Sequence, residues 1–175
     1  MELSPTAHVI LGMLSWGPKS GYDVKAIVDN STRFFWAASY GQIYPELRKL
    51  AEAGLIEAEA GPEGGRRRTV YRLSPTGHER LREWLSAEPE TYELRDDGLL
   101  RLFFAAAAPD TAAGTLASKR HYHEGLVEQF REIEATGKPE GFALAVLHYG
   151  IEMNEWAAAW CARAAADLES ATRAA

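Results

Sequence analysis

Apolar residues recur at helical spacing through the first 55 residues, and the pattern predicts three successive helices. Ser4 followed by Pro5 is typical of the start of the first helix, because the N–H that proline lacks is not needed there. Ser20 with Asp23 has the form of a capping box for the second helix, and Ser39 suits the cap of the third. We therefore expect a three-helix unit at the start of the chain.

The third helix has an apolar face and a polar face. Ile43, Leu47 and Leu50 follow one another at spacings of four and three, and Gly54 stands where the helix is expected to stop. Pro45 leaves open whether this helix is kinked or begins later. The polar face is either the front of an ordinary surface helix or a face that fits the major groove of DNA. Its residues are Tyr40, Gln42, Tyr44, Arg48 and Lys49.

A β-hairpin is expected after this helix, from the short extended runs 55–59 and 69–73. The loop between the two runs starts with glycine and proline and ends in three adjacent arginines, Arg66, Arg67 and Arg68. Three arginines on a loop are suited to phosphate contact, or they form a solvated charge run.

A fourth helix is predicted from Ser74-Pro75, with Leu81, Trp84 and Leu85 as its apolar face. The order of three helices, a hairpin with a basic loop and a helix is that of a winged helix-turn-helix with a two-stranded wing. In that arrangement the third helix enters the major groove and the wing touches an adjacent groove or the backbone.

An aromatic turn, Phe34-Phe35-Trp36, joins the second and third helices. Three adjacent large apolar residues are most simply explained as an anchor in the core of the three-helix unit. Alternatively, Phe35 and Trp36 form a platform for a small ligand.

The second half of the chain is predicted to be helical. Residues 87–94 form a linker, so the expected domains are 1–86 and 95–175. The last helix carries large apolar residues at alternating spacings of four and three, which is a heptad seam. A helix of about 30 residues, about 45 Å long, is not expected to bury such a seam within one small chain, so a second copy of the chain is the expected cover. The seam residues are Phe142, Val146, Tyr149, Met153, Trp156 and Trp160.

Composition and charge narrow the function further. The 175 residues are 46% hydrophobic and 25% charged, with a net charge of -6. Residues 1–86 carry a balance of +1 and residues 87–175 a balance of -7, so the first half alone is suited to approach a polyanion. No membrane span or secretory signal is expected, and a single cysteine, Cys161, is compatible with a cytoplasmic location.

Signals for catalysis or metal binding are weak. His148 and Glu152 are four residues apart on one helix, and a metal there would need ligands from another helix. No glycine-rich phosphate loop, nucleophile elbow or paired-carboxylate motif is present in the sequence. The sequence therefore predicts a mainly α-helical protein that is not an enzyme and needs neither a metal nor a cofactor.

Several segments resemble the PadR-type transcriptional regulators. The resemblance is dense over residues 3–86 and rests on Leu11-Gly-Met-Leu-Ser-Trp-Gly-Pro, Ser20-Gly-Tyr-Asp, Phe35-Trp-Ala-Ala-Ser-Tyr-Gly-Gln-Ile-Tyr-Pro-Glu-Leu, Gly54-Leu, Gly65-Arg-Arg-Arg and Val70-Tyr-Arg-Leu-Ser-Pro-Thr-Gly. Arg95-Asp-Asp-Gly-Leu-Leu-Arg-Leu-Phe-Phe is similar to the start of the longer helical C-terminal domain of one PadR branch. Many relatives have an acid or amide where this chain has Gly98.

The resemblance implies a homodimeric repressor that binds double-stranded operator DNA at an inverted repeat and is released by a small aromatic or amphiphilic effector. Two alternatives stay open: a DNA-binding regulator that is constitutive or answers to a protein partner, and an interaction module that binds no DNA. The residues expected to contact DNA are Ser20, Ser39, Tyr40, Gln42, Tyr44, Lys49, Arg66, Arg67 and Arg68, and those expected to contact an effector are Phe35 and Trp36.

Overall fold

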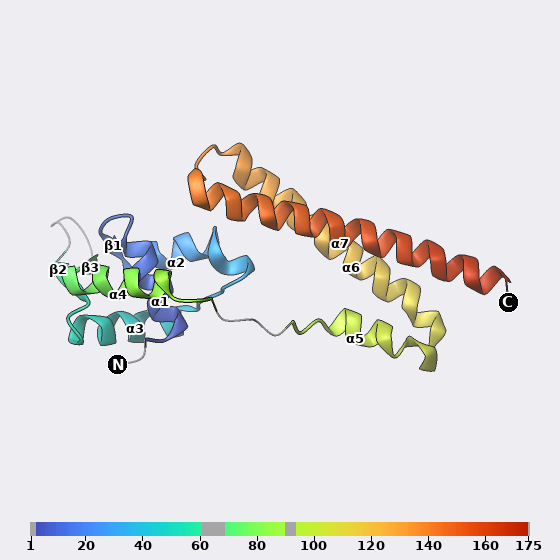
Figure 1. Ribbon diagram of the computed structural model, residues 1–175, viewed down its shortest axis with the longest axis horizontal. Coiled ribbons are helices and arrows are strands. Elements are labelled where there is room, and N and C mark those ends of the chain that lie inside the picture. The colour runs from blue at the N-terminus through green and yellow to red at the C-terminus, as the bar shows by residue number, and fades with distance from the viewer. Residues whose placement is uncertain (1–2, 61–68, 90–93, 175) are drawn as a thin grey trace. The chain divides into compact units, whose positions relative to one another are not determined.

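The computed structural model describes residues 3–60, 69–89 and 94–174, and the chain divides into two compact units, Met1–Thr91 and Tyr92–Ala175 (Figure 1). Part of the expected linker, residues 90–93, lies outside the described residues. The elements of the first unit are α1 (Pro5–Leu14), β1 (Lys19–Ser20), α2 (Gly21–Asp29), the 3-10 turn η1 (Thr32–Phe34), α3 (Tyr40–Glu52), β2 (Ile56–Ala60), β3 (Thr69–Leu73) and α4 (Pro75–Ser86).

The predicted serine caps form. Ser4 Oγ accepts from the Ala7 N–H at 3.1 Å, and Ser74 Oγ accepts from the Gly77 N–H at 3.0 Å. Helix α3 begins at Tyr40, directly after Ser39, and continues through Pro45, which settles where this helix starts. These caps satisfy backbone N–H groups that the first turn of a helix leaves without partners.

Helix α3 ends as Gly54 predicts. Gly54 has a φ of 70°, and the N–H of Leu55 donates to the carbonyl of Leu50 at 2.9 Å. This is a Schellman-type ending, in which glycine supplies the left-handed residue and an apolar contact accompanies the turn. Leu50 and Leu55 are both buried, so the ending of α3 and the start of the hairpin belong to one core.

The sheet contains three strands in the order β1-β3-β2, where the sequence predicts only two. Strand β1 pairs antiparallel with β3 on the edge away from β2. Two residues are too few to show an alternating pattern, so this strand leaves no signal in the sequence.

The core of the first unit is built from one face of each helix and the inner ends of the strands. Of the expected α4 face only Leu81 is buried, whereas Trp84 and Leu85 are 47% and 67% exposed. The prediction for these two residues is wrong because α4 presents a narrow stripe to the core, and the Trp84 ring stacks on His8 of α1 instead, with centroids 4.6 Å apart. The buried residues are Ala7, Ile10, Leu11, Met13, Leu14, Val24, Val28, Ala38, Ile43, Leu47, Leu50, Leu55, Ile56, Leu73 and Leu81.

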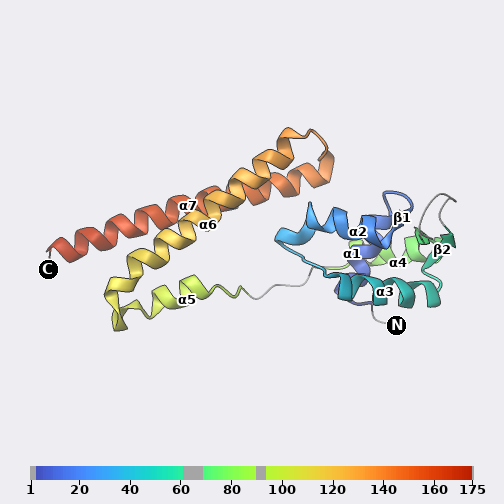
Figure 2. The same cartoon turned by 180° about the vertical axis from the view of Figure 1, so that it is seen from behind.

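The second unit is helical, as expected. Helices α6 and α7 run antiparallel and cross along their length, as two opposite views show (Figures 1 and 2). The salt bridge between Lys119 of α6 and Asp96, which caps α5, spans 2.5 Å. The elements are α5 (Asp97–Phe103), the 3-10 turns η2 (Ala105–Ala107) and η3 (Pro109–Thr111), α6 (Ala112–Ala135) and α7 (Gly141–Ala174). Within the described ranges, no helix combines the length and apolar character that a membrane crossing requires.

Candidate nucleic-acid interface

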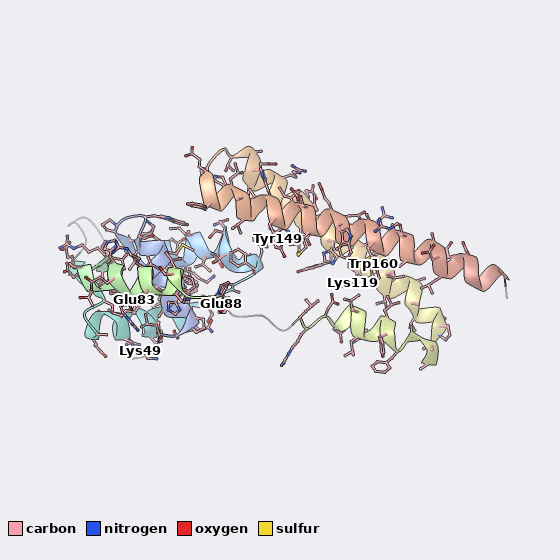
Figure 3. The ribbon with its side chains drawn as sticks, in the orientation of Figure 1. Lys49, Glu83, Glu88, Lys119, Tyr149 and Trp160 are labelled. Carbon is pink, nitrogen blue, oxygen red and sulfur yellow. The ribbon has the colours of Figure 1, made fainter. Side chains whose placement is uncertain are left out.

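Helix α3 buries one face and exposes the other. Ile43 and Leu47 are fully buried, whereas Tyr40 and Tyr44 are 47% and 43% exposed. The Lys49 side chain is 68% exposed and projects from the outer side of the helix (Figure 3). The amphipathic pattern in the sequence therefore correctly identifies the face that is available to a partner.

The first turn of α3 is closed by its own side chains. Gln42 Oε1 accepts from the backbone N–H of Ser39 at 2.9 Å and from the Ser39 hydroxyl at 3.1 Å. Both lone pairs of this oxygen are then occupied, while the amide NH₂ of Gln42 remains a donor. A bidentate pair with adenine needs the oxygen as well, so Gln42 must release a cap bond to read that base.

The two tyrosines of α3 lie one turn apart and stack on each other. The centroids of the Tyr40 and Tyr44 rings are 6.1 Å apart, with an interplanar angle of 20°. Neither hydroxyl has a hydrogen-bond partner among the residues that the structure describes. Both hydroxyls are thus available as donors and acceptors on the exposed face.

An ion-pair and hydrogen-bond chain anchors α3 to α1. Glu46 Oε1 accepts from the Ser4 hydroxyl at 2.8 Å, and Glu46 Oε2 lies 3.5 Å from Lys49 Nζ. The contact to Lys49 is long and the Lys49 side chain is mostly exposed, so the ammonium group can still meet a phosphate. Ser4 therefore both caps α1 and orients α3.

Ser20 is a correction to the predicted set of DNA contacts. It is 2% exposed, its hydroxyl donates to Asp23 Oδ2 at 2.8 Å, and its backbone N–H donates to the same oxygen at 3.0 Å. A buried hydroxyl that closes the capping box of α2 cannot also reach a phosphate. Its role is to fix the start of α2.

One residue near this face is absent from the predicted set. Lys25 of α2 places its Nζ 5.2 Å from the centroid of the Tyr40 ring. The only trace of it in the sequence is a position four residues after Gly21, on the same side of α2. Helical spacing alone does not say that this side faces α3.

The wing arginines Arg66, Arg67 and Arg68 lie outside the described residues. On the adjoining strand β3, Arg72 Nε donates to Glu57 Oε2 at 2.8 Å, and Arg72 is also ion-paired with Glu59. The hydrogen bond that Arg72 donates to Glu57 and the charge of Glu59 raise the pKa of Arg72. Its charge is therefore balanced within the hairpin.

The aromatic turn is exposed, which corrects the expectation that it anchors the core. Phe35 and Trp36 are 63% and 46% exposed, and the small Ala38 is buried in their place. Thr32 Oγ1 in the same turn is a buried oxygen with no hydrogen-bond partner among the described residues. The turn keeps the features of a platform for a ligand.

Most of the seam of α7 points away from α6, whereas Trp160 is partly buried. Phe142, Tyr149 and Trp156 are 94%, 63% and 63% exposed, and Tyr149 lies on the outer side of the helix (Figure 3). The buried side chains of α7 lie on a different side of the helix and are Ile151, Asn154, Ala158 and Cys161. Exposed apolar patches of this kind mark interaction sites.

Two histidines of the second unit, His123 and His148, join α6 to α7. His148 Nε2 lies 2.7 Å from Glu134 Oε1 of α6, and His123 Nδ1 lies 2.7 Å from Asn154 Oδ1. Over the described part of the chain, no group of three or more His, Cys, Asp or Glu side chains is arranged to hold a metal ion.

Two protein families match this chain. Residues 10–83 match the family described as "Transcriptional regulator PadR-like family", and residues 94–169 match "Virulence activator alpha C-term". The negative transcriptional regulator PadR of Bacillus subtilis (strain 168) is 29% identical over 145 residues, which cover 78% of this chain and 79% of that protein.

Solved structures share the fold of the whole chain. The crystal structure of Bacillus subtilis PadR in complex with operator DNA has a TM-score of 0.83 at 24% identity, and covers 93% of this chain and 98% of that one. The structure of the same protein in complex with p-coumaric acid has a TM-score of 0.78 at 23% identity, with 96% and 99% covered.

Proposed function

The chain belongs to the PadR-like family of transcriptional regulators, and from this premise we propose that it is a homodimeric repressor that binds an inverted-repeat operator and is released by a small molecule. Its membership confirms the prediction of a PadR-type regulator that is not an enzyme. The observation that carries the proposal is the outer face of α3, on which phenol hydroxyls, an amide and cationic groups stand over an apolar base.

The operator is read by α3 in the major groove. Tyr40, Tyr44 and the amide NH₂ of Gln42 contact base edges, and Ser39 lies at the first turn, where the helix meets the groove. Lys49 and the wing arginines Arg66–Arg68 contact phosphates and make the affinity depend on salt. That Bacillus subtilis PadR was crystallised with operator DNA supports this assignment.

Two copies pair through α7, with Phe142, Val146, Tyr149, Met153, Trp156 and Trp160 at the interface. Five of these side chains are at least 43% exposed in the single chain, and a second copy gives each of them an apolar partner. Pairing places two copies of α3 about one DNA turn, roughly 34 Å, apart, which requires an inverted repeat.

The effector binds at the aromatic turn. Phe35 and Trp36 supply stacking surfaces, and the Thr32 hydroxyl, which has no hydrogen-bond partner among the described residues, supplies a hydrogen bond to the effector. A small phenolic or amphiphilic molecule has both kinds of group. The complex of Bacillus subtilis PadR with p-coumaric acid supports an effector of this class. The effector acts by its higher affinity for an arrangement that does not fit the operator.

The main test compares a variant that removes a proposed base contact with one that removes the proposed phosphate contacts. A duplex selected by the wild-type protein from a random pool, and a scrambled duplex, are titrated by fluorescence anisotropy at several salt concentrations. Gln42→Ala should reduce the preference for the selected duplex with a modest loss of non-specific affinity, whereas alanine at all three of Arg66–Arg68 should weaken both duplexes and flatten the salt dependence. The reverse pattern would move base reading to the wing, and failure to enrich any duplex would contradict the proposed function.

A second candidate is a regulator that is constitutive or answers to a protein partner. To distinguish it from a repressor released by an effector, p-coumaric acid and a panel of phenolic and cationic amphiphiles are added to the protein–DNA complex. Release of DNA with quenching of tryptophan fluorescence, reduced in Trp36→Leu, supports an effector. Unchanged anisotropy and fluorescence with the whole panel favour the second candidate.

A further inference from the structure

Two residues of α2 each lie next to a tyrosine of α3. Gly21 and Lys25 are four residues apart on α2, and Tyr44 and Tyr40 are four residues apart on α3. Lys25 Nζ lies 5.2 Å from the centroid of the Tyr40 ring, and a Cβ atom at Gly21 would lie 2.8 Å from Cε1 of Tyr44. One helix therefore contacts both exposed tyrosines of the other.

Lys25 holds its place through two contacts. Its ammonium group is ion-paired with Asp29, one turn further along α2, and lies at the Tyr40 ring. Its side chain is only 13% exposed, compared with 68% for Lys49. An ammonium that is covered and already paired is badly placed to contact a phosphate, but a cation near an aromatic ring restrains that ring.

Gly21 makes room for the Tyr44 ring because glycine has no side chain. The Tyr44 ring occupies the position where a side chain at residue 21 would stand, and Leu47 Cδ1 would lie 3.0 Å from the same Cβ. Tyr44 in turn stacks on Tyr40. Each ring is therefore restrained by α2 on one side and by the other ring.

We propose that Lys25 and Gly21 are positioning residues for base reading, which hold Tyr40 and Tyr44 in the orientation that the DNA groove requires. This inference rests on the proposed function, since it assigns the tyrosines to the interface. Restrained rings lose less conformational freedom on binding than free ones, and a hydroxyl held in place distinguishes bases more sharply than one that can turn away. Lys25 then affects selectivity without touching DNA itself.

The test measures selectivity and not affinity alone. The ratio of the affinities for the selected and the scrambled duplex is measured for wild type, Lys25→Met, Lys25→Arg and Lys49→Met. Lys25→Met should lower this ratio by about three- to tenfold, and Lys25→Arg should restore it, because arginine keeps a cation at the ring. Lys49→Met removes the same charge from the exposed face and should lower both affinities equally, which leaves the ratio unchanged.

A double-mutant cycle tests whether Lys25 acts through Tyr40. In a Tyr40→Leu background the change Lys25→Met should have no further effect on the ratio, because the ring that it restrains is absent. Gly21→Ala should lower the ratio by displacing Tyr44. Circular dichroism melting curves within a few degrees of wild type show that the Lys25 variants are folded.

The outcomes separate this inference from the proposed function. If the wild-type protein selects a duplex and Lys25→Met keeps the wild-type ratio, Lys25 is not a positioning residue although the proposed function stands. The same conclusion follows if Lys25→Met lowers the ratio equally with and without the Tyr40 ring. If the wild-type protein selects no duplex, the proposed function itself is wrong.

Discussion

Gly77 of α4 lies against the carbonyl oxygen of Leu55, so closely that a Cβ atom at residue 77 would come within 2.0 Å of that oxygen. The neighbouring Ser74 hydroxyl donates to the Gly54 carbonyl at 2.7 Å. These two contacts attach α4 to the turn that ends α3. The atom opposite Gly77 belongs to the backbone, which cannot turn aside as a side chain can.

Gly77→Ala should therefore destabilise the first unit, by about 2–3 kcal/mol, through forced displacement of α4. Urea unfolding followed by circular dichroism measures the change. Gly12→Ala in α1 is the matched control, because nothing lies within 4 Å of a Cβ atom there. Alanine in that helix should stabilise by about 0.5–1 kcal/mol. Equal midpoints for Gly77→Ala and wild type would contradict the close contact.

Lys119→Met should weaken the attachment of α5 to α6. Lys119 Nζ lies 2.5 Å from Asp96 Oδ2, and Lys119 Cδ would lie 2.6 Å from a Cβ atom at residue 98, so Gly98 leaves the space through which the lysine passes. This explains why glycine suits position 98 in this chain, where many relatives have an acid or amide. We expect a loss of about 1 kcal/mol at neutral pH, measured as a lower melting temperature, and no loss for the exposed Lys138→Met.

The same variant should change the acid sensitivity of the second unit. Burial alone would raise the pKa of Asp96, but hydrogen bonds from Lys119 and from the Leu99 N–H outweigh burial and lower it. A lowered pKa in the folded chain gives stability that is present above the unfolded pKa of about 3.9 and is lost as the pH falls through the folded pKa. In Lys119→Met the loss of stability on acidification should therefore begin at a higher pH than in wild type. The melting temperature of both proteins is measured between about pH 2 and pH 6, and the same pH dependence in both would refute this prediction.

His8 should titrate below its usual range. Burial against Trp84 and the charge of Arg80 lower the pKa of His8 from 6.5. The stability that the neutral ring contributes is present above the unfolded pKa and lost as the pH falls through the folded pKa. An NMR titration of the ring proton, assigned with His8→Asn, should give a midpoint below 6.5, and Arg80→Gln should raise it. A midpoint at or above 6.5 would show that the ring is not shielded.

Trp156→Glu should dissociate the proposed dimer. A carboxylate in the centre of an apolar interface is left without a partner, and loss of a central tryptophan typically costs 2 kcal/mol or more, about thirtyfold or more in the dissociation constant. Sedimentation equilibrium measures the change. Ala159→Glu, at an exposed position of α7 outside the seam, is the control and should leave the mass unchanged. An unchanged mass for Trp156→Glu would place the dimer contacts elsewhere.

The sequence by itself determined the helices of the first unit and the side of α3 that faces outward. Ser4, Ser39 and Ser74 mark helix starts because the groups that a cap satisfies lie within three residues of it along the chain. Ile43 and Leu47 are buried for an equally local reason, since residues at this spacing share one face of a helix. Contacts between residues this close along the chain can be predicted from the sequence alone.

Only the tertiary structure decided what lies opposite each of these faces. Gly21 beside Tyr44, Gly77 against Leu55 and Lys119 over Gly98 each join residues more than 20 positions apart. The exposure of Phe35, against expectation, has the same origin, because composition does not say whether neighbouring helices leave room for a large ring. Such contacts depend on how closely separate helices and strands approach one another, and the spacing of residues along the chain does not determine the distance between those elements.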